Sequence, residues 1–404
     1  MSAYWVPLKR IASLNPETLG DHTGPGTEFR YIDISATGRG RLVGDPEPMT
    51  FESAPSRARR VLRQGDTILS TVRTYLRAVW TLRDPEPDLV ASTGFVCLRP
   101  RPGVEPRYLG WLAQSDLVVE EVVARSVGVS YPAINPSDVG LIKVPLPAIG
   151  GQREIADFLD RETARIDALL SSRRRQMQLL EDRFWVAFAR RVERTETRST
   201  PLRRVLTSLI DGPFGSAFSS SAYVDEGAAV VRLGNIGFAT YNHADQARIP
   251  EGLYEEFSAY AITRGDLLIA GLGDDRNHAG RACVAPDLGH AIVKGKCFRG
   301  RVNDQSSAGF LAFLLSSPLG AAAMGVSGRG STRAMINLDV VKSTEMPLPH
   351  REAQDAIVAE TTAQRRLTQA AIASAQRQTD LLAERRQALI TVAVTGQIEV
   401  PVAA

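Results

Sequence analysis

The chain has 404 residues, of which 44% are apolar and 23% are charged. This balance excludes wholesale disorder, and at ~100–200 residues per domain the length predicts two to four folding units. No stretch approaches the ~20 consecutive apolar residues of a membrane span, and the first residues do not resemble a signal peptide. The spacing of Cys97, Cys283 and Cys297 fits neither a disulfide framework nor a zinc site. We therefore expect a cytoplasmic protein with reduced thiols.

The charge is nearly balanced, with 48 basic and 45 acidic residues and a net charge of +3. Only five of the basic residues are Lys, so the rest are Arg. A GC-rich genome produces such a bias, whereas Arg also suits bidentate contacts to phosphate and guanine. Because no segment is strongly basic, a role in binding nucleic acid requires locally clustered charge.

The chain is an imperfect tandem repeat with an offset of about 202 residues. At this offset Pro145-Leu146-Pro147 falls on Pro347-Leu348-Pro349, and Gln152 falls on Gln354. Further matched pairs are Ile134 and Ile336, Asn135 and Asn337, Leu179-Leu180 and Leu381-Leu382 and, at an offset of 200, Gly65-Asp66 and Gly265-Asp266 with Cys97 and Cys297. The stretch from 145 to 183 aligns without gaps, whereas the stretch before it diverges. This pattern predicts two modules with one scaffold and different ligands.

The predicted elements follow the repeat. Hydrophobic periodicity predicts strands at 30–34 and 66–71, a short helix at 106–114 and a long helix at 152–192, then strands at 229–233 and 266–270, a short helix at 308–316 and a second long helix at about 352–394. Each globular part is expected to hold a mostly antiparallel or mixed sheet flanked by short helices. We expect a globular part at 1–150, a long helix within 151–198, a second globular part at 199–350 and a second long helix within 351–404.

The two long helices are predicted to pack together. At 1.5 Å per residue each is ~60 Å long, which exceeds the span of a globular part. The alternative is that each helix packs on its own globular part. The apolar positions expected at the coiled-coil or subunit interface are Ile155, Leu159, Ile166, Leu169, Leu180, Ile357, Ile372 and Leu382. The Arg173-Arg174-Arg175 run is either a solvated face or a contact to phosphate or a partner.

Motifs for covalent chemistry are missing. There is no phosphate-binding loop, no nuclease motif and no metal spacing among the five histidines. Asn135-Pro136-Ser137 is the nearest approach to the Asn-Pro-Pro-aromatic tetrad of aminomethyltransferases, and Gly38-Arg39-Gly40 is interpreted as an ordinary glycine loop. We therefore expect that the chain does no covalent chemistry.

Polar loops remain as candidates for recognition. Residues that read base edges and phosphates gather at 71–77 and 128–131 and in the equivalent loops of the second repeat, although ordinary turn chemistry explains any one of them equally well. The candidates are Arg73, Tyr75, Arg77, Ser130 and Tyr131 in the first repeat and Arg276, Asn277, His278, Arg281, Thr332 and Arg333 in the second. Arg77 and Arg281 are interpreted as equivalent ends of two hairpin loops, and both are predicted to contact DNA.

The helical motif is familiar. Val144-Pro145-Leu146-Pro147, continued by residues 152–160 and 166–170, closely resembles the conserved region of type I restriction–modification specificity subunits. Met346-Pro347-Leu348-Pro349 and the ending at 393–398 resemble the second conserved region, although the sequence at 350–353 departs from the usual form. The sequence at 211–216 resembles a motif near the start of a target-recognition domain, which adds Phe214 and Ser216 as candidates.

This resemblance implies an α/β (α+β) fold with two target-recognition domains, separated by two long helices in an antiparallel coiled coil. Each domain would read one half of a split, asymmetric double-stranded DNA site. Two modification subunits would bind S-adenosylmethionine and methylate adenine, and restriction subunits would bring ATP and Mg²⁺. The chain itself would bind no cofactor or metal and would have no catalytic residue. The alternatives are a DNA-binding or coiled-coil scaffold outside a restriction system, and a fused methyltransferase–specificity protein.

Overall fold

The computed structural model describes residues 4–400 except 21, 85, 214–219, 275 and 326–333. The chain divides into two compact units, one formed by Met1–Arg174 with Ala375–Ala404 and the other by Arg175–Ser374. Each unit contains one globular part and a portion of both long helices, α4 (Ile149–Glu193) and α9 (Arg351–Val394). The units are described in turn.

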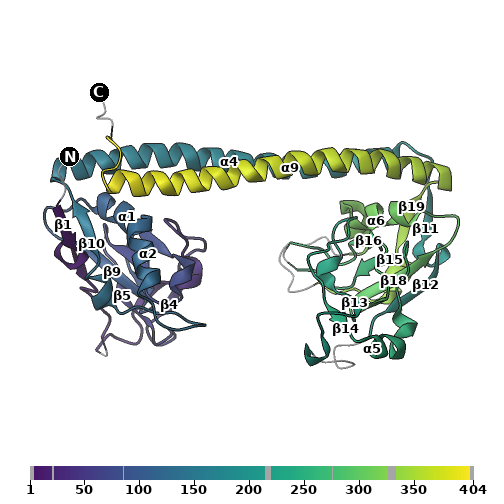
Figure 1. Ribbon diagram of the computed structural model, residues 1–404, viewed down its shortest axis with the longest axis horizontal. Coiled ribbons are helices and arrows are strands. Elements are labelled where there is room, and N and C mark those ends of the chain that lie inside the picture. The colour runs from purple at the N-terminus through teal and green to yellow at the C-terminus, as the bar shows by residue number, and fades with distance from the viewer. Residues whose placement is uncertain are drawn as a thin grey trace. The chain divides into compact units, whose positions relative to one another are not determined.

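The first unit holds three sheets with short helices beside them (Figure 1). Its strands are β1 (Tyr4–Pro7), β2 (Ala12–Leu14), β3 (Glu28–Ile32), β4 (Glu47–Thr50), β5 (Ala58–Val61), β6 (Thr67–Ser70), β7 (Val79–Thr81), β8 (Leu89–Ser92), β9 (Phe95–Pro100) and β10 (Lys143–Leu146). Its short helices are α1 (Pro106–Gln114), α2 (Asp116–Ala124) and α3 (Pro136–Val139). Among the described residues of this unit the sheet orders are β2-β9-β6-β7, β4-β3-β8-β5 and β1-β10, and β3 and β8 are the one pair of strands that runs parallel.

The second unit repeats this plan. Its strands are β11 (Arg198–Pro201), β12 (Leu206–Asp211), β13 (Ala228–Val231), β14 (Arg248–Ile249), β15 (Leu267–Ala270), β16 (Ala282–Val284), β17 (Ala291–Val293), β18 (Cys297–Val302) and β19 (Glu345–Leu348). Its short helices are α5 (Glu251–Glu256), α6 (Ala308–Ser316), α7 (Pro318–Ala323) and α8 (Leu338–Ser343). The sheet orders are β12-β18-β15-β16, β14-β13-β17 and β11-β19, with one parallel pair, β13 and β17. The predicted mixture of mostly antiparallel strands is confirmed, but the single sheet expected in each globular part is divided into three.

The matched Gly-Asp pairs build the same turn in both units. Gly65 and Gly265 have φ angles of +88° and +94°, a conformation that glycine adopts without steric cost. The carboxylate of Asp66 then accepts the backbone N–H of Arg63 (2.8 Å), as that of Asp266 accepts the N–H of Thr263 (2.9 Å). Each turn leads directly into a fully buried strand, β6 or β15.

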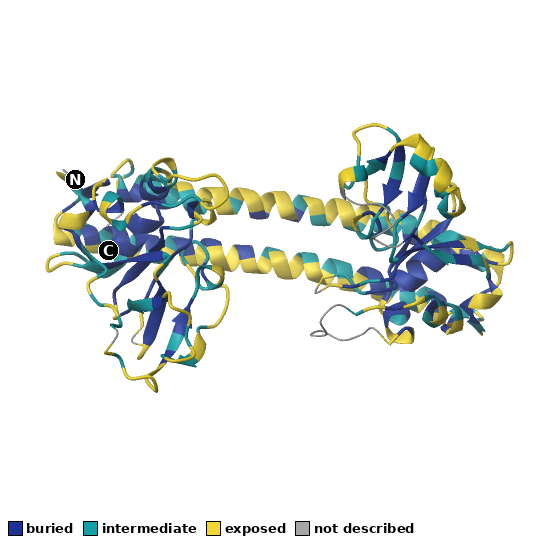
Figure 2. Ribbon diagram, turned by 90° about the horizontal axis from the view of Figure 1, so that it is seen from below, coloured by how far each residue is buried: buried dark blue, intermediate teal, exposed yellow. Residues whose placement is uncertain are grey.

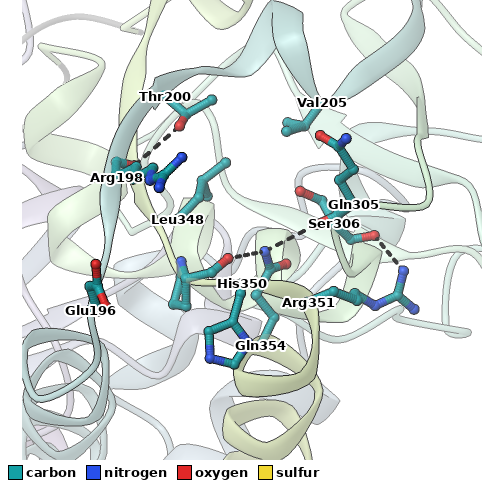
Figure 3. Close-up of a pocket in the computed structure, with 11 residues that line it drawn as sticks. Glu196, Arg198, Thr200, Val205, Gln305, Ser306, Leu348, His350, Arg351 and Gln354 are labelled. Carbon is teal, nitrogen blue, oxygen red and sulfur yellow. Dashed lines mark hydrogen bonds between the residues drawn. The ribbon is translucent and has the colours of Figure 1, made fainter.

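The matched glutamines explain why the repeat is so regular where the long helices begin, and Figure 3 shows Gln354 of the second unit. In the second unit the side-chain amide of Gln354 donates to the carbonyl of Pro349 (2.8 Å) and accepts the N–H of Ser307 (2.8 Å). In the first unit Gln152 donates to Pro147 (2.9 Å) and accepts the N–H of Glu105 (2.9 Å). Both glutamines are 1% exposed. Each therefore joins the turn after its Pro-Leu-Pro strand to the start of a short helix, α1 or α6.

The long helices pack against each other within each unit. The ion pairs between them are Asp167–Arg386 (2.9 Å) in the first unit and Glu181–Arg365 (2.5 Å) and Arg191–Glu360 (3.1 Å) in the second. Residue numbers rise along α4 as they fall along α9, so the pairing is antiparallel, as predicted. The middle portions of both helices are mostly exposed, whereas their end portions join the buried cores (Figure 2).

The buried positions of α4 follow a heptad spacing. In the first unit the buried residues of α4 are Gln152, Ile155, Ala156, Leu159, Thr163, Ile166 and Leu170, and those from Ala156 onward alternate in steps of three and four. Of the other positions that the sequence analysis placed at the interface, Ile155 and Ile357 are buried and Leu180, Ile372 and Leu382 are half-buried. The prediction that Leu169 lies between the two long helices is wrong, because its side chain is 51% exposed. Leu170, which is 7% exposed, lies in the seam between the helices instead.

Candidate nucleic-acid interface

The two candidate loops of the first unit lie side by side. The backbone N–H of Arg73 donates to the carbonyl of Pro132 (2.8 Å), and that of Ile134 donates to Thr71 (2.9 Å). The hydroxyl of Thr74 also donates to that of Ser126 (2.8 Å). These bonds join the loop at 71–77 to the segment at 127–133 as one surface.

This surface carries aromatic and cationic side chains in the open. The guanidinium of Arg73 lies over the ring of Tyr131, 4.8 Å from its centroid. Tyr131 is 62% exposed and Tyr75 is 53% exposed, and Ser130 is also exposed. Stacked arginine and tyrosine present flat faces and fixed donors, the groups that contact bases and phosphates.

Arg73 and Arg77 stand at the two ends of a short 3₁₀ helix, Thr74–Leu76, and both have left-handed backbones, with φ angles of 53° and 52°. A residue with a Cβ adopts this conformation at a cost of roughly 1–3 kcal/mol. Arg77 is further fixed by an ion pair with Glu120 (2.7 Å). Such backbone strain at the exposed Arg73 and the half-buried Arg77 makes both residues candidates for a functional role.

A cavity of about 860 Å³ lies behind this loop pair, lined among others by Arg73, Tyr131, Asp33 and Arg57. Arg57 is paired with Asp33 (2.9 Å), and its Nε donates to the hydroxyl of Tyr31. The hydrogen bond to Tyr31 and the charge of Asp33 raise the pKa of Arg57. The sequence analysis missed Arg57, and the only signal for it was the short basic stretch that follows Ser56.

The hairpin of the second unit is held by its own side chains. The carboxylate of Asp274 accepts the backbone N–H groups of Arg276 and Asn277 (2.8 Å each) and the side-chain amide of Asn277 (3.0 Å). These hydrogen bonds, that from Arg276 first, lower the pKa of Asp274. Asn277 is thus engaged in closing the turn, and Arg276 is exposed.

His278 is turned inward. Its Nδ1 lies 2.8 Å from the carbonyl oxygen of Ala279, and its Nε2 lies 3.3 Å from that of Ser316. Its ring packs edge-on against Phe238, with 5.2 Å between the ring centroids. The side chain is half-buried. These contacts give His278 a place in the packing of the hairpin.

The prediction that Arg281 contacts DNA is wrong. Arg281 is 4% exposed, and its guanidinium donates to the carbonyls of Ile236 (2.7 Å), Leu272 (3.0 Å), His278 (3.1 Å) and Leu233 (3.1 Å). Burial lowers the pKa of Arg281, but an arginine stays charged far above neutral pH. Because all three guanidinium nitrogens donate to backbone carbonyls inside the unit, Arg281 ties loops together and is not available to DNA.

The equivalence of Arg77 and Arg281 is also wrong. The N–H of Ser70 donates to the carbonyl of Ala78, and the N–H of Ala270 donates to that of Arg281, so Arg281 stands at the place of Ala78. Arg77 is matched by Gly280, which shares its positive φ angle (+88°). The second hairpin is longer than the first, which is why residue counting misplaced the pair.

The remaining candidates, Phe214, Ser216, Thr332 and Arg333, lie outside the described residues. In the described part of the chain, no group of three His, Cys, Asp or Glu side chains is placed to hold a metal ion. Among the same residues no helix has the length and hydropathy of a membrane span.

Comparisons with known proteins find similarity to the family that the helical motif resembles. No family model matches the chain. A 79-residue segment, 19% of this chain and 17% of its relative, is 30% identical to the specificity subunit of the type I restriction enzyme StySPI of Salmonella potsdam. The match thus spans about a sixth of that relative's length.

Solved structures extend the likeness to the whole chain. A chain from a structure that describes complex assembly and conformational transition of the type I restriction–modification system is 25% identical, covers 98% of both chains and has a TM-score of 0.70. The HsdS subunit of Thermoanaerobacter tengcongensis is also 25% identical over 98% of this chain, with a TM-score of 0.46. The likeness over the whole chain at a TM-score of 0.70, together with the local match to a specificity subunit, confirms the predicted resemblance to type I specificity subunits and the predicted fold class.

Proposed function

We propose that this chain, which resembles the specificity subunits of type I restriction–modification systems, is the non-catalytic subunit that selects the DNA sequence in such a complex. The observation that carries the proposal is the likeness over 98% of the chain, at a TM-score of 0.70, to a chain of a type I system. The local match to a curated specificity subunit supports it independently.

Each unit would read one half of a split DNA site. In support, the two units share one scaffold, with matched Gly-Asp turns and matched glutamine contacts. Their exposed loops differ, because Arg73 and Tyr131 stack in the first unit whereas Asp274 and Asn277 close the hairpin in the second. A common frame with different loops suits two readers of different half-sites. The paired helices would set the distance between the half-sites.

The chemistry would come from partners. Two modification subunits would bind S-adenosylmethionine and methylate adenine, and restriction subunits would use ATP and Mg²⁺ to move and cut DNA. The chain would work in the cytoplasm, where these subunits and the DNA meet, and would bind no cofactor itself.

Methylome sequencing of the host with and without this gene tests the proposal. We expect one bipartite adenine-methylated motif to disappear when the gene is deleted and to return when it is restored. Persistence of every methylated motif in the deletion strain contradicts the proposal.

In vitro, a mobility shift with and without the modification subunit separates a specificity subunit from a scaffold that does not bind DNA. Methylation by the highly purified chain alone would point to a fused methyltransferase instead.

A further inference from the structure

A basic cleft in the first unit has a lining that shares no residue with the loop pair at 71–77 and 127–133. It has a volume of about 420 Å³ and separates the turn at 38–41 from the helices α4 and α9. Four arginines line it: Arg39 and Arg41 from the turn, Arg174 from α4 and Arg386 from α9. Asp167 is the one acidic residue among the lining side chains.

The charges in the cleft do not cancel. Arg386 is paired with Asp167 (2.9 Å), and Arg39 is paired with Asp116 (2.8 Å), which lies outside the lining. Within the described residues, neither the side chain of Arg41 nor that of Arg174 makes a hydrogen bond or an ion pair, and both residues are exposed. Two positive charges are thus left facing the same space.

The cleft is held in shape before any ligand arrives. The guanidinium of Arg39 also donates to the carbonyl of Gln114 (2.7 Å), which fixes the turn against the end of α1. Gly40 has a φ angle of +79° and donates its N–H to Val79 (2.7 Å), and a Cβ at this position would stand 2.1 Å from the side-chain oxygen of Gln114. The guanidinium of Arg386 lies 5.7 Å from the ring centroid of Trp111. A pre-organised charged site loses little entropy when it binds.

The second unit has the same turn without the charge. The N–H of Gly237 donates to the carbonyl of Thr240 (3.0 Å), as that of Gly38 donates to Arg41 (2.9 Å). The N–H of Ala239 donates to Ala282, as that of Gly40 donates to Val79. By this correspondence Arg39 is replaced by Phe238, and Arg41 by Thr240.

The helices repeat this difference. At the offset of 202 residues, Arg174 corresponds to Gln376 and Arg386 corresponds to Phe184. The packing supports the correspondence of Arg386 with Phe184. The ring centroids of Phe184 and Phe313 lie 6.3 Å apart, just as the guanidinium of Arg386 lies near the ring of Trp111. All four arginines thus have uncharged counterparts on the same scaffold, so the fold does not require them.

From this difference we infer that the cleft binds a phosphate group of the DNA backbone, in addition to the base-reading loops. Arginine presents planar, paired donors that match phosphate oxygens, and two of the four arginines are free to supply them. The inference rests on the proposed function, since it takes DNA as the ligand. It also means that the first unit binds the DNA backbone more tightly than the second unit does.

The test uses the complex of this chain with its modification subunit and compares Arg41→Ala, Arg174→Ala and the double variant with the wild type. Each single variant is expected to bind target and non-target duplexes more weakly by a similar factor. Each should also lower the slope of log affinity against log salt by about one, and the double variant by about two. The methylated sequence should not change. Arg161→Ala, an exposed arginine on the same helix that does not line the cleft, is the matched control and should keep the wild-type slope.

The outcomes separate the inference from the proposed function. If the wild-type complex selects its target and the variants keep its affinity and salt slope, the inference is overturned and the proposed function stands. If the variants change which sequence is methylated, these arginines read bases and the assignment to phosphate is wrong. If the wild-type complex selects no sequence, the proposed function fails first.

A titration with inorganic phosphate tests the other possible ligand of the same chemistry, a small phosphate compound. Saturable binding that the double variant abolishes, together with unchanged DNA binding, would assign the cleft to a small phosphate compound and overturn the inference. We expect only weak phosphate binding, because a single free anion lacks the other contacts that a duplex makes with the protein.

Discussion

Arg276 and Arg281 show how differently two arginines of one hairpin are used. Arg281 is 4% exposed and donates to four backbone carbonyls, whereas Arg276 is exposed. Replacing Arg281 with Ala would leave these buried carbonyls without donors. We expect Arg281→Ala to lower the free energy of unfolding by about 2–4 kcal/mol, measured by urea denaturation. Arg276→Ala should change it by less than about 0.5 kcal/mol, and equal stability of the two variants would contradict the structural role of Arg281.

The strained backbone of Arg73 allows a test in which stability and DNA affinity are expected to change in opposite directions. Glycine adopts φ angles near +53° without steric cost, so Arg73→Gly removes strain and keeps the N–H donated to Pro132. We expect the free energy of unfolding of the variant to equal that of the wild type or to exceed it by up to about 1 kcal/mol. We expect its affinity for DNA to be lower. Thermal melting and DNA titration of the same sample measure both. A loss of stability with unchanged DNA binding would show that Arg73 serves the fold.

The sequence identified the residue types of these loops but not their roles. Arg281 and Arg77 look alike in the sequence, and only the hydrogen bonds of β6 and β15 show that Arg281 stands at the place of Ala78. Arg39 belongs to the turn that the sequence analysis interprets as an ordinary glycine loop, and Arg41 follows it. Their meaning depends on Arg174 and Arg386, which are remote in sequence. Charge clusters formed by tertiary contacts leave no local pattern.

At the scale of elements, adjacent leucines separate the seam of the helix pair from its outer surface. Leu170 is 7% exposed and Leu169 is 51% exposed. Truncation of a buried leucine loses transfer free energy and leaves a cavity, so Leu170→Ala should destabilise the chain by about 2–3 kcal/mol. Leu169→Ala should cost less than about 0.5 kcal/mol. Urea denaturation of the two variants measures the difference, and a larger cost at Leu169 would mean that the seam lies on the other face.

Helices were predicted more closely than sheets. The short helices at Pro106–Gln114 and Ala308–Ser316 have the predicted bounds, and α9 begins one residue before its predicted start. The helix α4 begins at Ile149, so Gly150 and Gly151 lie in its first turn and not before it. Helical periodicity is a local signal, whereas the division of each globular part into three sheets depends on pairings between distant strands, such as β3 with β8.

At the scale of the whole molecule, the two globular parts should be exchangeable. If each unit reads one half-site, replacing residues 1–143 with the same segment of a related specificity subunit should change one half of the methylated site and leave the other half unchanged. The physical reason is that the exchanged segment carries Arg73 and Tyr131, while the second hairpin stays in place. Methylome sequencing of the chimera reads both halves, and a change in both would contradict one unit for each half-site.

The last prediction concerns the distance between the half-sites. If the paired helices set that distance, four residues added to each helix, after Ser172 in α4 and after Asp380 in α9, should lengthen the spacer. Four residues rise ~6 Å and turn by about 400°, so the seam keeps its phase to within about 40°. At ~3.4 Å per base pair the spacer should grow by about one to two base pairs, with both half-sites unchanged.

The ion pairs on either side of the insertion explain why both helices must change. Asp167–Arg386 and Glu181–Arg365 lie on opposite sides of the added residues, and an insertion in α4 alone would move one pair against the other. The one-helix insertion is therefore the control and should lose methylation by disrupting the pairing. Two residues added to each helix would turn the seam by about half a turn and should also fail. Methylome sequencing measures the spacer directly, and a double insertion that still methylates at the original spacing would show that the helices do not set the distance.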